Sequence, residues 1–221
     1  MTKNGLSKEL IALRAVRELE EGMYVNLGVG LPTLVSQFIP PGREVMLHSE
    51  NGILGYGPIA GEDEMDVDLV NAGLQPVVLM PGAAFFNHAD SFAMIRGGHL
   101  SLTILGAHQV SEKGDLANWK TPEEKVGAVG GAMDLVCGAR RVMILMRHTQ
   151  PSGEPRLVKQ CTYPLTGKGV VNTIITDLAL IDVTPEGLVL KELAPGITVD
   201  DVQALTEPRL IVSPDLHEME I

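Results

Sequence analysis

An acidic residue stands between turn-forming residues in the segment Ser49-Glu50-Asn51-Gly52. The apolar run Val45-Met46-Leu47 and His48 precede this segment, and such a run followed by Asn-Gly is typical of a buried strand that ends in a tight turn. A carboxylate there would lie at the rim of a sheet, where ligands of open α/β folds bind. Glu50 would be partly desolvated and held on rigid backbone, which suits a nucleophile or a general base. The commoner role of a lone acidic turn residue is to accept hydrogen bonds from turn amides.

Two glycine-rich loops have backbone amides that could bind an anion or a developing oxyanion, because no side chain blocks the approach. Gly28-Val29-Gly30 opens a predicted helix, so its amides would also lie at the positive end of the helix dipole. The segment Gly127–Gly131 could present paired amides to a carbonyl oxygen. Close packing of a helix on a strand explains the first loop equally well, and a flexible connector explains the second.

The first glycine loop also permits a dinucleotide-binding interpretation. Gly28 and Gly30 match the first two positions of the GxGxxG fingerprint, and Glu50 follows Gly30 by 20 residues, near the spacing of the acid that binds an NAD ribose. The third position is Thr33, however, which spoils the close helix–strand crossing that a small residue permits. A ribose-binding acid also gives no reason for the Asn51-Gly52 turn. An NAD-dependent oxidoreductase is therefore the second-ranked alternative.

The other candidate nucleophiles and metal ligands are weaker. Cys137 lies in a helix-like apolar stretch and Cys161 in a strand-like one, so we expect both to be buried as small hydrophobic residues. His48 and Ser49 are neighbours on one predicted strand and point to opposite faces, so they cannot readily form a Ser–His pair. No CxxC or HxxxH spacing is present, and we expect no metal site.

Composition narrows the class of protein. The 221 residues are 45% hydrophobic and 20% charged, which is globular, and aromatic residues make up only 4%, so the core must be aliphatic. The net charge of −11 argues against nucleic acid or an anionic membrane surface as a partner, and a phosphate-bearing ligand would need a local pocket of donors. No apolar stretch approaches the roughly 18 residues that span a bilayer. Two cysteines make no disulfide framework, and the polar N-terminus lacks the apolar region of a signal peptide, so we expect a cytoplasmic protein.

The order of the predicted elements indicates an α/β fold. A strand at Tyr24–Leu27, a helix from Pro32 to about Phe38 and a strand at Val45–His48 form a βαβ unit, so part of the sheet must be parallel. The other predicted elements are helices at 8–21, 90–96 and 132–138, strands at 76–80, 102–105 and 142–146, hairpins joining 107–110 to 116–119 and 178–183 to 188–193, and a short helix after a capping box of Thr198 and Asp201. We expect a single domain, residues 1–221, with an open α/β/α architecture, a mixed, largely parallel sheet and added hairpins.

Several motifs in a fixed order make the sequence specific. They are Asn26-Leu27-Gly28-Val29-Gly30-Leu31-Pro32, His48-Ser49-Glu50-Asn51-Gly52, Asp115-Leu116-Ala117-Asn118-Trp119 and Gly130-Gly131-Ala132-Met133-Asp134, with further matches at Ser91–His99 and Tyr163–Gly167. With these motifs the chain resembles the B-type (beta) subunit of the 3-oxoacid coenzyme A-transferases, the class I CoA-transferases, over nearly its whole length. Val29 stands where Ile is common in that family, a conservative change.

The resemblance implies that Glu50 is the catalytic carboxylate, which carries CoA as a thioester. It implies that the CoA and substrate site is lined by Asn26, Gly28, Gly30, Asn51, Asn118, Gly130 and Gly131, with the Gly131 amide as an oxyanion donor. No permanently bound cofactor is implied, because CoA is both a substrate and a covalent intermediate.

The resemblance also implies a partner, the A-type CoA-transferase subunit, in a heterodimer or heterotetramer, because family members of this length are one of two related subunits. The implied reaction moves CoA between succinyl-CoA and a 3-oxoacid, acetoacetate or 3-oxoadipate, by a ping-pong mechanism. Phe85–Ser91 and Tyr163–Gly167 look similar to the 3-oxoadipate version, but the sequence leaves the choice open. A thioesterase on the same scaffold, and a regulatory subunit with an inert Glu50, are further alternatives.

Overall fold

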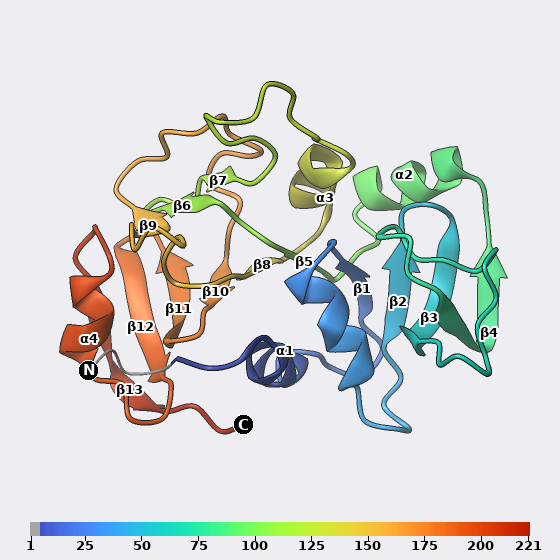
Figure 1. Cartoon of the computed structure of the whole chain (residues 1–221), viewed down its shortest axis with the longest axis horizontal. Coiled ribbons are helices and arrows are strands. Elements are labelled where there is room, and N and C mark those ends of the chain that lie inside the picture. The colour runs from blue at the N-terminus through green and yellow to red at the C-terminus, as the bar shows by residue number, and fades with distance from the viewer. Residues whose placement is uncertain (1–4) are drawn as a thin grey trace.

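The computed structural model describes residues 5–221, so the first four residues of the polar N-terminal segment lie outside the described part. A ten-stranded mixed sheet has the order β13-β12-β11-β10-β8-β5-β1-β2-β3-β4 (Figure 1). Its strands are β1 (Tyr24–Leu27), β2 (Met46–Ser49), β3 (Ile53–Ile59), β4 (Val77–Phe85), β5 (Leu102–Leu105), β8 (Val142–Leu145), β10 (Thr173–Ile175), β11 (Ala179–Thr184), β12 (Gly187–Leu193) and β13 (Ile211–Glu218). The α/β class with a mixed sheet is confirmed.

A second, three-stranded sheet has the order β7-β6-β9, formed by Leu116–Ala117, Gln109–Ser111 and Leu157–Val158. The helices are α1 (Lys8–Val16), the 3₁₀ helix η1 (Leu31–Gln37), α2 (His88–Arg96), α3 (Ala132–Gly138) and α4 (Val199–Ala204). The predicted hairpin of β6 and β7 is present and antiparallel, but it belongs to this small sheet.

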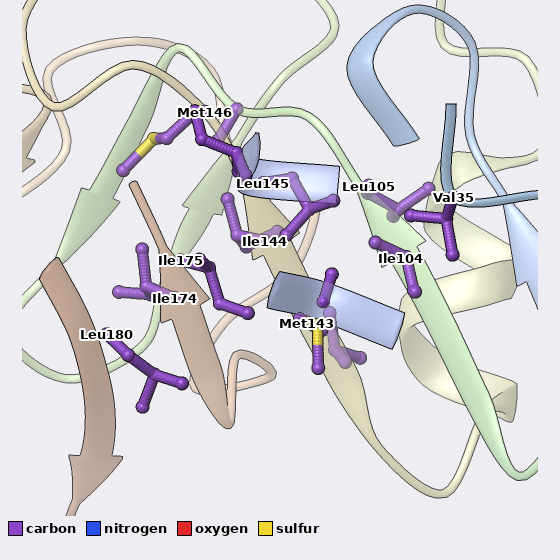
Figure 2. Packing of buried hydrophobic residues seen from close by; sticks show 14 of the residues in the cluster. Val35, Ile104, Leu105, Met143, Ile144, Leu145, Met146, Ile174, Ile175 and Leu180 are labelled. Atoms are coloured by element: carbon purple, nitrogen blue, oxygen red, sulfur yellow. The ribbon is translucent and has the colours of Figure 1, made fainter. Parts of the chain in front are cut away.

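The centre of the large sheet is parallel. The neighbours β10, β8, β5, β1 and β2 pair in parallel, as the predicted βαβ unit requires. Strands β5 and β8, Leu-Thr-Ile-Leu and Val-Met-Ile-Leu, are buried at every position, which is typical of strands covered on both faces. Figure 2 shows the aliphatic packing here, with Ile104 and Leu105 of β5 near Val35 of η1, and Met143, Ile144 and Leu145 of β8 between them and Ile174 and Ile175 of β10.

The strand register places three strand ends side by side. Asn26 of β1 is opposite His48 of β2, and Leu27 of β1 is opposite Ile104 of β5. The segments that follow β5, β1 and β2 therefore leave the sheet at one edge. In Figure 1, α2, α3 and the small sheet gather above this edge.

Both edge strands of the large sheet contain a proline. A proline normally argues against a strand, which is why the predicted strand at 76–80 is too short and β13 was not predicted. We predicted a strand at 76–80, but β4 continues to Phe85 through Pro81. Strands β4 and β13, which contains Pro214, are the two outer strands of the sheet, where a missing N–H breaks no ladder on the solvent side. Strands β3, β9, β10 and β13 were not predicted.

Two predicted helices have tighter geometry than expected. Helix α1 ends at Val16 rather than residue 21, but Arg17, Glu18 and Leu19 continue it through i→i−3 hydrogen bonds. The helix after Pro32 is a 3₁₀ helix, η1, in which Thr33 N–H bonds to Gly30 O at 3.2 Å. The prediction for α3 and for the capping box of Thr198 and Asp201 is confirmed.

The expectation that both cysteines are buried is wrong. Cys137 is exposed, because only one side of the short helix α3, through Leu135 and Val136, contacts the core. Cys161 lies in a loop rather than a strand and is partly exposed. Burial, as the largest cause, raises the pKa of its thiol to about 11, so it is a poor nucleophile near neutral pH.

A buried histidine, His148, joins three segments beyond β8. Its Nδ1 lies 2.9 Å from Thr176 Oγ1, and its Nε2 lies 2.9 Å from Thr206 Oγ1. Burial lowers the pKa of His148 to about 4, against a smaller opposing effect of Asp177, so the ring is neutral at pH 7.

This burial predicts a loss of stability in acid. The folded pKa is depressed, so between pH 7 and 5 the unfolded chain takes up a proton at His148 that the folded chain refuses. The free energy of unfolding should fall by about 2 kcal/mol from this residue. His148→Gln should be less stable at pH 7 yet show a shallower decline towards pH 5 in urea unfolding followed by Trp119 fluorescence. Equal declines in the two proteins would contradict the prediction.

Candidate active site

A pocket of about 650 Å³ opens at the edge where β5, β1 and β2 end. Three neighbouring strand ends contribute to its wall, namely Gly28 and Val29 after β1, Glu50 after β2, and the segment Leu105–His108, which begins at the last residue of β5. The loop that enters α3, residues 128–132, together with Ala72, Asn118, Leu135 and Arg156, completes the lining. A crevice outside the carboxyl ends of parallel strands is the usual place for a ligand in an open α/β sheet.

Glu50 occupies a locked turn between β2 and β3. Gly52 N–H bonds to Ser49 O at 3.0 Å, and Phe86 N–H bonds to Gly52 O at 3.1 Å. Gly52 has a φ of +121°, and a Cβ there would lie 2.2 Å from Phe86 O, so no other residue fits. The predicted tight turn is confirmed. It holds the half-buried Glu50 at the pocket wall.

Asn26 orients the Glu50 carboxylate from beneath. Its Nδ2 donates to Glu50 Oε2 at 3.0 Å and lies 3.2 Å from His48 Nδ1. On its other side, Thr103 Oγ1 donates to Asn26 Oδ1 at 3.5 Å. Asn26 is fully buried, so the sheet, rather than the loop, sets the direction of this donor.

His48 and Ser91 extend this contact into a chain of four residues, Ser91–His48–Asn26–Glu50, which we call the positioning chain. His48 Nε2 lies 3.0 Å from Ser91 Oγ on α2. Burial lowers the pKa of His48, opposed by the charge of Glu50, so the ring is neutral at pH 7. Because Nδ1 faces the amide donor of Asn26, we assign the proton to Nε2, which donates to Ser91.

The strand alternation at His48 and Ser49 is confirmed. Ser49 Oγ accepts the N–H of Ala72 at 2.9 Å, away from the imidazole, so there is no Ser–His pair between neighbours. The serine that contacts His48 comes from α2, 43 residues along the chain. Sequence reasoning missed this role of Ser91, although Ser91 opens one of the quoted motifs.

The loop before α3 approaches the carboxylate closely. A Cβ on Gly131 would lie 3.9 Å from Glu50 Oε1 and 3.0 Å from the ring of Phe92. Gly131 therefore brings its backbone next to the Glu50 oxygen that Asn26 does not engage. The Gly131 N–H makes no hydrogen bond to another residue of the described range 5–221.

The other predicted site residues divide into two groups. Gly28, Gly130 and Asn118 line the pocket with Glu50 and Gly131. Asn118 is also a structural tie, since its Nδ2 donates to Gly106 O at 3.2 Å and its Oδ1 accepts from Thr166 Oγ1 at 2.6 Å.

Gly30 and Asn51 do not line the pocket. The exposed Asn51 side chain donates to Val70 O at 2.7 Å. Gly30 caps η1, and its carbonyl accepts from the hydroxyl of Thr33 at 2.6 Å. The dinucleotide alternative finds no support here, because Gly30 leads into a seven-residue 3₁₀ helix instead of a long α-helix with an open N-terminus.

Comparison with known proteins identifies the family. The family model described as "Coenzyme A transferase" matches residues 8–205. The chain is 54% identical to the B-type subunit of 3-oxoadipate CoA-transferase from Pseudomonas putida, over 93% of this chain and 97% of that protein. It is 53% identical to human mitochondrial succinyl-CoA:3-ketoacid coenzyme A transferase 2 over 95% of this chain but only 41% of the human protein.

The fold has a solved counterpart. The acyl-CoA transferase YdiF of Escherichia coli O157:H7 superposes with a TM-score of 0.79 as the apoenzyme, at 20% identity, over 97% of this chain and 43% of that one. A thioester complex of YdiF with CoA superposes with a TM-score of 0.78. The family match, supported by the identity to the curated relatives, settles the class: this chain belongs to the coenzyme A transferase family.

Membrane-spanning helices and metal-ligand clusters are both absent from residues 5–221. None of the helices in this range is long and apolar enough to cross a membrane. Within the same range, no three side chains of the His, Cys, Asp or Glu type are grouped as metal ligands would be.

The positioning chain predicts a selective effect of a buried hydroxyl. Ser91→Ala leaves the His48 Nε2–H without its partner, so Asn26 loses its fixed orientation towards Glu50. We expect kcat of the assembled enzyme to fall about 10-fold, equivalent to about 1.4 kcal/mol, with little change in KM for the acyl-CoA, and Ser91→Thr to retain most activity. Ser111→Ala removes another buried hydroxyl away from the pocket and serves as the control. Loss of stability without loss of kcat in Ser91→Ala would refute the role.

Proposed function

We propose that this chain is the catalytic B-type subunit of an enzyme that transfers CoA between succinyl-CoA and a 3-oxoacid, either acetoacetate or 3-oxoadipate. The observation that carries the proposal is a carboxylate, Glu50, set in a pocket at the strand ends by Asn26 and flanked by Gly131. Curated relatives named for 3-oxoadipate and for a 3-ketoacid match with nearly equal identity, 54% and 53%, so the acceptor acid is left as a choice of two.

The chemistry uses Glu50 as a nucleophile. Its carboxylate attacks the acyl-CoA carbonyl and expels the CoA thiolate, which forms an acyl–glutamyl anhydride. The thiolate attacks the glutamyl carbonyl, so the first carboxylic acid leaves and CoA remains as a glutamyl thioester. The acceptor carboxylate then reverses both steps and departs as its CoA ester. Glutamate suits this exchange because it is chemically equivalent to the substrate acids, so each net exchange of CoA between two carboxylates is close to isoenergetic.

Each neighbour of Glu50 has a proposed part in these steps. Asn26 engages Oε2, which leaves Oε1, the oxygen nearer Gly131, to attack. The uncommitted Gly131 N–H stabilises the tetrahedral oxyanion, a contribution typically of about 3–4 kcal/mol for one donor. Gly130, where a Cβ would meet open space, lets the acyl-CoA approach the backbone, and Asn118 offers a polar group to it. Gly28 lines the pocket and packs closely on β5, since a Cβ there would lie 2.8 Å from the Leu105 side chain.

Gly30 and Asn51 act in this proposal through loop conformation. Gly30 has a φ of +93°, and at this residue the chain turns from the pocket-lining residues Gly28 and Val29 into η1. Asn51 ties the Glu50 turn to the loop at Val70. CoA is part of the substrate and is bound covalently to Glu50 in the intermediate, and no permanently bound cofactor takes part.

We further propose a partner chain, the A-type CoA-transferase subunit, in a heterodimer or heterotetramer. The chain spans 97% of the B-type subunit from Pseudomonas putida but about two fifths of the human enzyme, which supports a second subunit that corresponds to the remainder. The two free thiols, one of them exposed, support a reducing cytoplasm. The enzyme would serve ketone-body use or the degradation of aromatic compounds, according to its acceptor acid.

Substitution of the nucleophile tests the proposal. Glu50→Gln keeps the shape of the side chain but removes the carboxylate, so CoA exchange by the assembled enzyme should fall at least about 10⁴-fold. The control Glu186→Gln makes the same change on an exposed hairpin turn and should leave exchange unchanged. Exchange that survives in Glu50→Gln would refute the assignment.

The acceptor distinguishes transfer from hydrolysis. We expect succinyl-CoA consumption beyond one equivalent per active site only when acetoacetate or 3-oxoadipate is supplied, with CoA recovered as the ester of that acid. Steady release of CoA with water as the acceptor would instead identify a thioesterase.

A further inference from the structure

Arg156 is a cation in the wall of the Glu50 pocket that sequence analysis did not single out. It stands directly before β9 and is half-buried. Its Nη1 donates to Ala107 O at 2.5 Å, and its Nε donates to Thr149 O at 3.2 Å. These two backbone carbonyls fix the guanidinium plane, while Nη2 makes no hydrogen bond to another residue of the range 5–221.

Arg156 forms no ion pair within the described part of the chain. The arginines that pair with carboxylates there are Arg14, Arg17, Arg96, Arg141 and Arg147. Asp177, whose charge acts on Arg156 from further away, is already bonded by Arg147 and by the N–H of His148.

Arg156 is also the fixed positive charge of the pocket. The titratable lining residues are Glu50, His108 and Arg156. Burial, followed by the Arg156 charge, lowers the pKa of His108, so that ring is neutral at pH 7. A guanidinium stays protonated under these conditions. The net charge of −11 repels anionic ligands, so such a ligand needs a local positive charge to bind. Arg156 is partly desolvated and has no carboxylate of residues 5–221 as a partner, so it can supply that charge.

Arg156 and Glu50 line one pocket, and the sheet places the backbone anchor of Arg156 two strands away from Glu50. Ala107, which anchors Arg156, follows β5, while Glu50 follows β2, and β1 lies between these strands. Two strand spacings amount to about 10 Å. An extended four-carbon diacid spans roughly 4 Å between its carboxyl carbons and a six-carbon diacid roughly 6 Å, from C–C bonds of about 1.5 Å. With contacts of about 3 Å at each end, such a chain bridges the gap.

We propose that Arg156 binds the free carboxylate at the far end of a dicarboxylic acyl group while Glu50 reacts with the carbonyl at the near end. The proposal rests on the proposed function and adds a specificity determinant to it. A planar guanidinium held by two carbonyls is preorganised for a carboxylate, and this contact selects succinyl and 3-oxoadipyl groups. An acetoacetyl group has no second carboxylate and gains nothing from Arg156.

The same variant measured with two CoA esters tests this inference. In the assembled enzyme, Arg156→Gln should lower kcat/KM for glutamyl-thioester formation from succinyl-CoA about 10- to 100-fold. Thioester formation from acetoacetyl-CoA should change less than about threefold. Arg156→Lys should recover part of the activity lost with succinyl-CoA, because lysine keeps the positive charge but lacks the paired N–H donors of a guanidinium. Arg209→Gln, an exposed arginine far along the chain, is the matched control.

The outcomes distinguish an acyl carboxylate from a CoA phosphate as the anion that Arg156 binds. An equal loss with both esters would mean that Arg156 binds a phosphate of CoA or supports the fold, and it would overturn the proposal. No loss with either ester would overturn it as well. If the wild-type enzyme forms no thioester from either ester, the proposed function fails instead, which this experiment reports separately.

Discussion

The parallel register of β5, β1 and β2 is the constraint on which the site depends. Because Asn26 stands opposite His48 and next to Thr103, the polar side chains of three neighbouring strands share one face. A slip of one residue in β1 would turn Asn26 to the other face and place an aliphatic neighbour beneath Glu50. The same register leaves the three following loops at one edge, where they form the pocket wall.

Polar groups at the centre of a sheet are costly to bury unless they satisfy one another. Here Thr103, Asn26, His48 and Ser91 do so, and within the described range no buried side-chain polar atom lacks a hydrogen-bond partner. The donors therefore cannot rotate freely, since each would lose its bond. We infer that the sheet converts this burial into a fixed direction for one carboxylate oxygen, which leaves the other oxygen to the substrate.

Much of this arrangement could be predicted from local sequence. The strand Tyr24–Leu27, helix α3 and the capping box of Thr198 depend on nearby residues, and the structure agrees with the prediction. The turn after Glu50 was readable because Asn51-Gly52 is a strong local signal. By contrast, β13 was not predicted, because it contains a proline and because helix α4 separates it in sequence from its partner β12. Ser91 contacts His48, 43 residues away in sequence, and Arg156 contacts Ala107, 49 residues away. No local sequence pattern predicts contacts between residues so far apart.

The most direct test of the central claim is the mass of the peptide that contains Glu50. The assembled enzyme would be quenched in acid midway through turnover with succinyl-CoA, digested, and analysed by mass spectrometry. The account predicts that a fraction of this peptide gains the mass of CoA less one water, and that borohydride removes the adduct. A peptide that never gains mass while the product CoA ester accumulates would contradict the account.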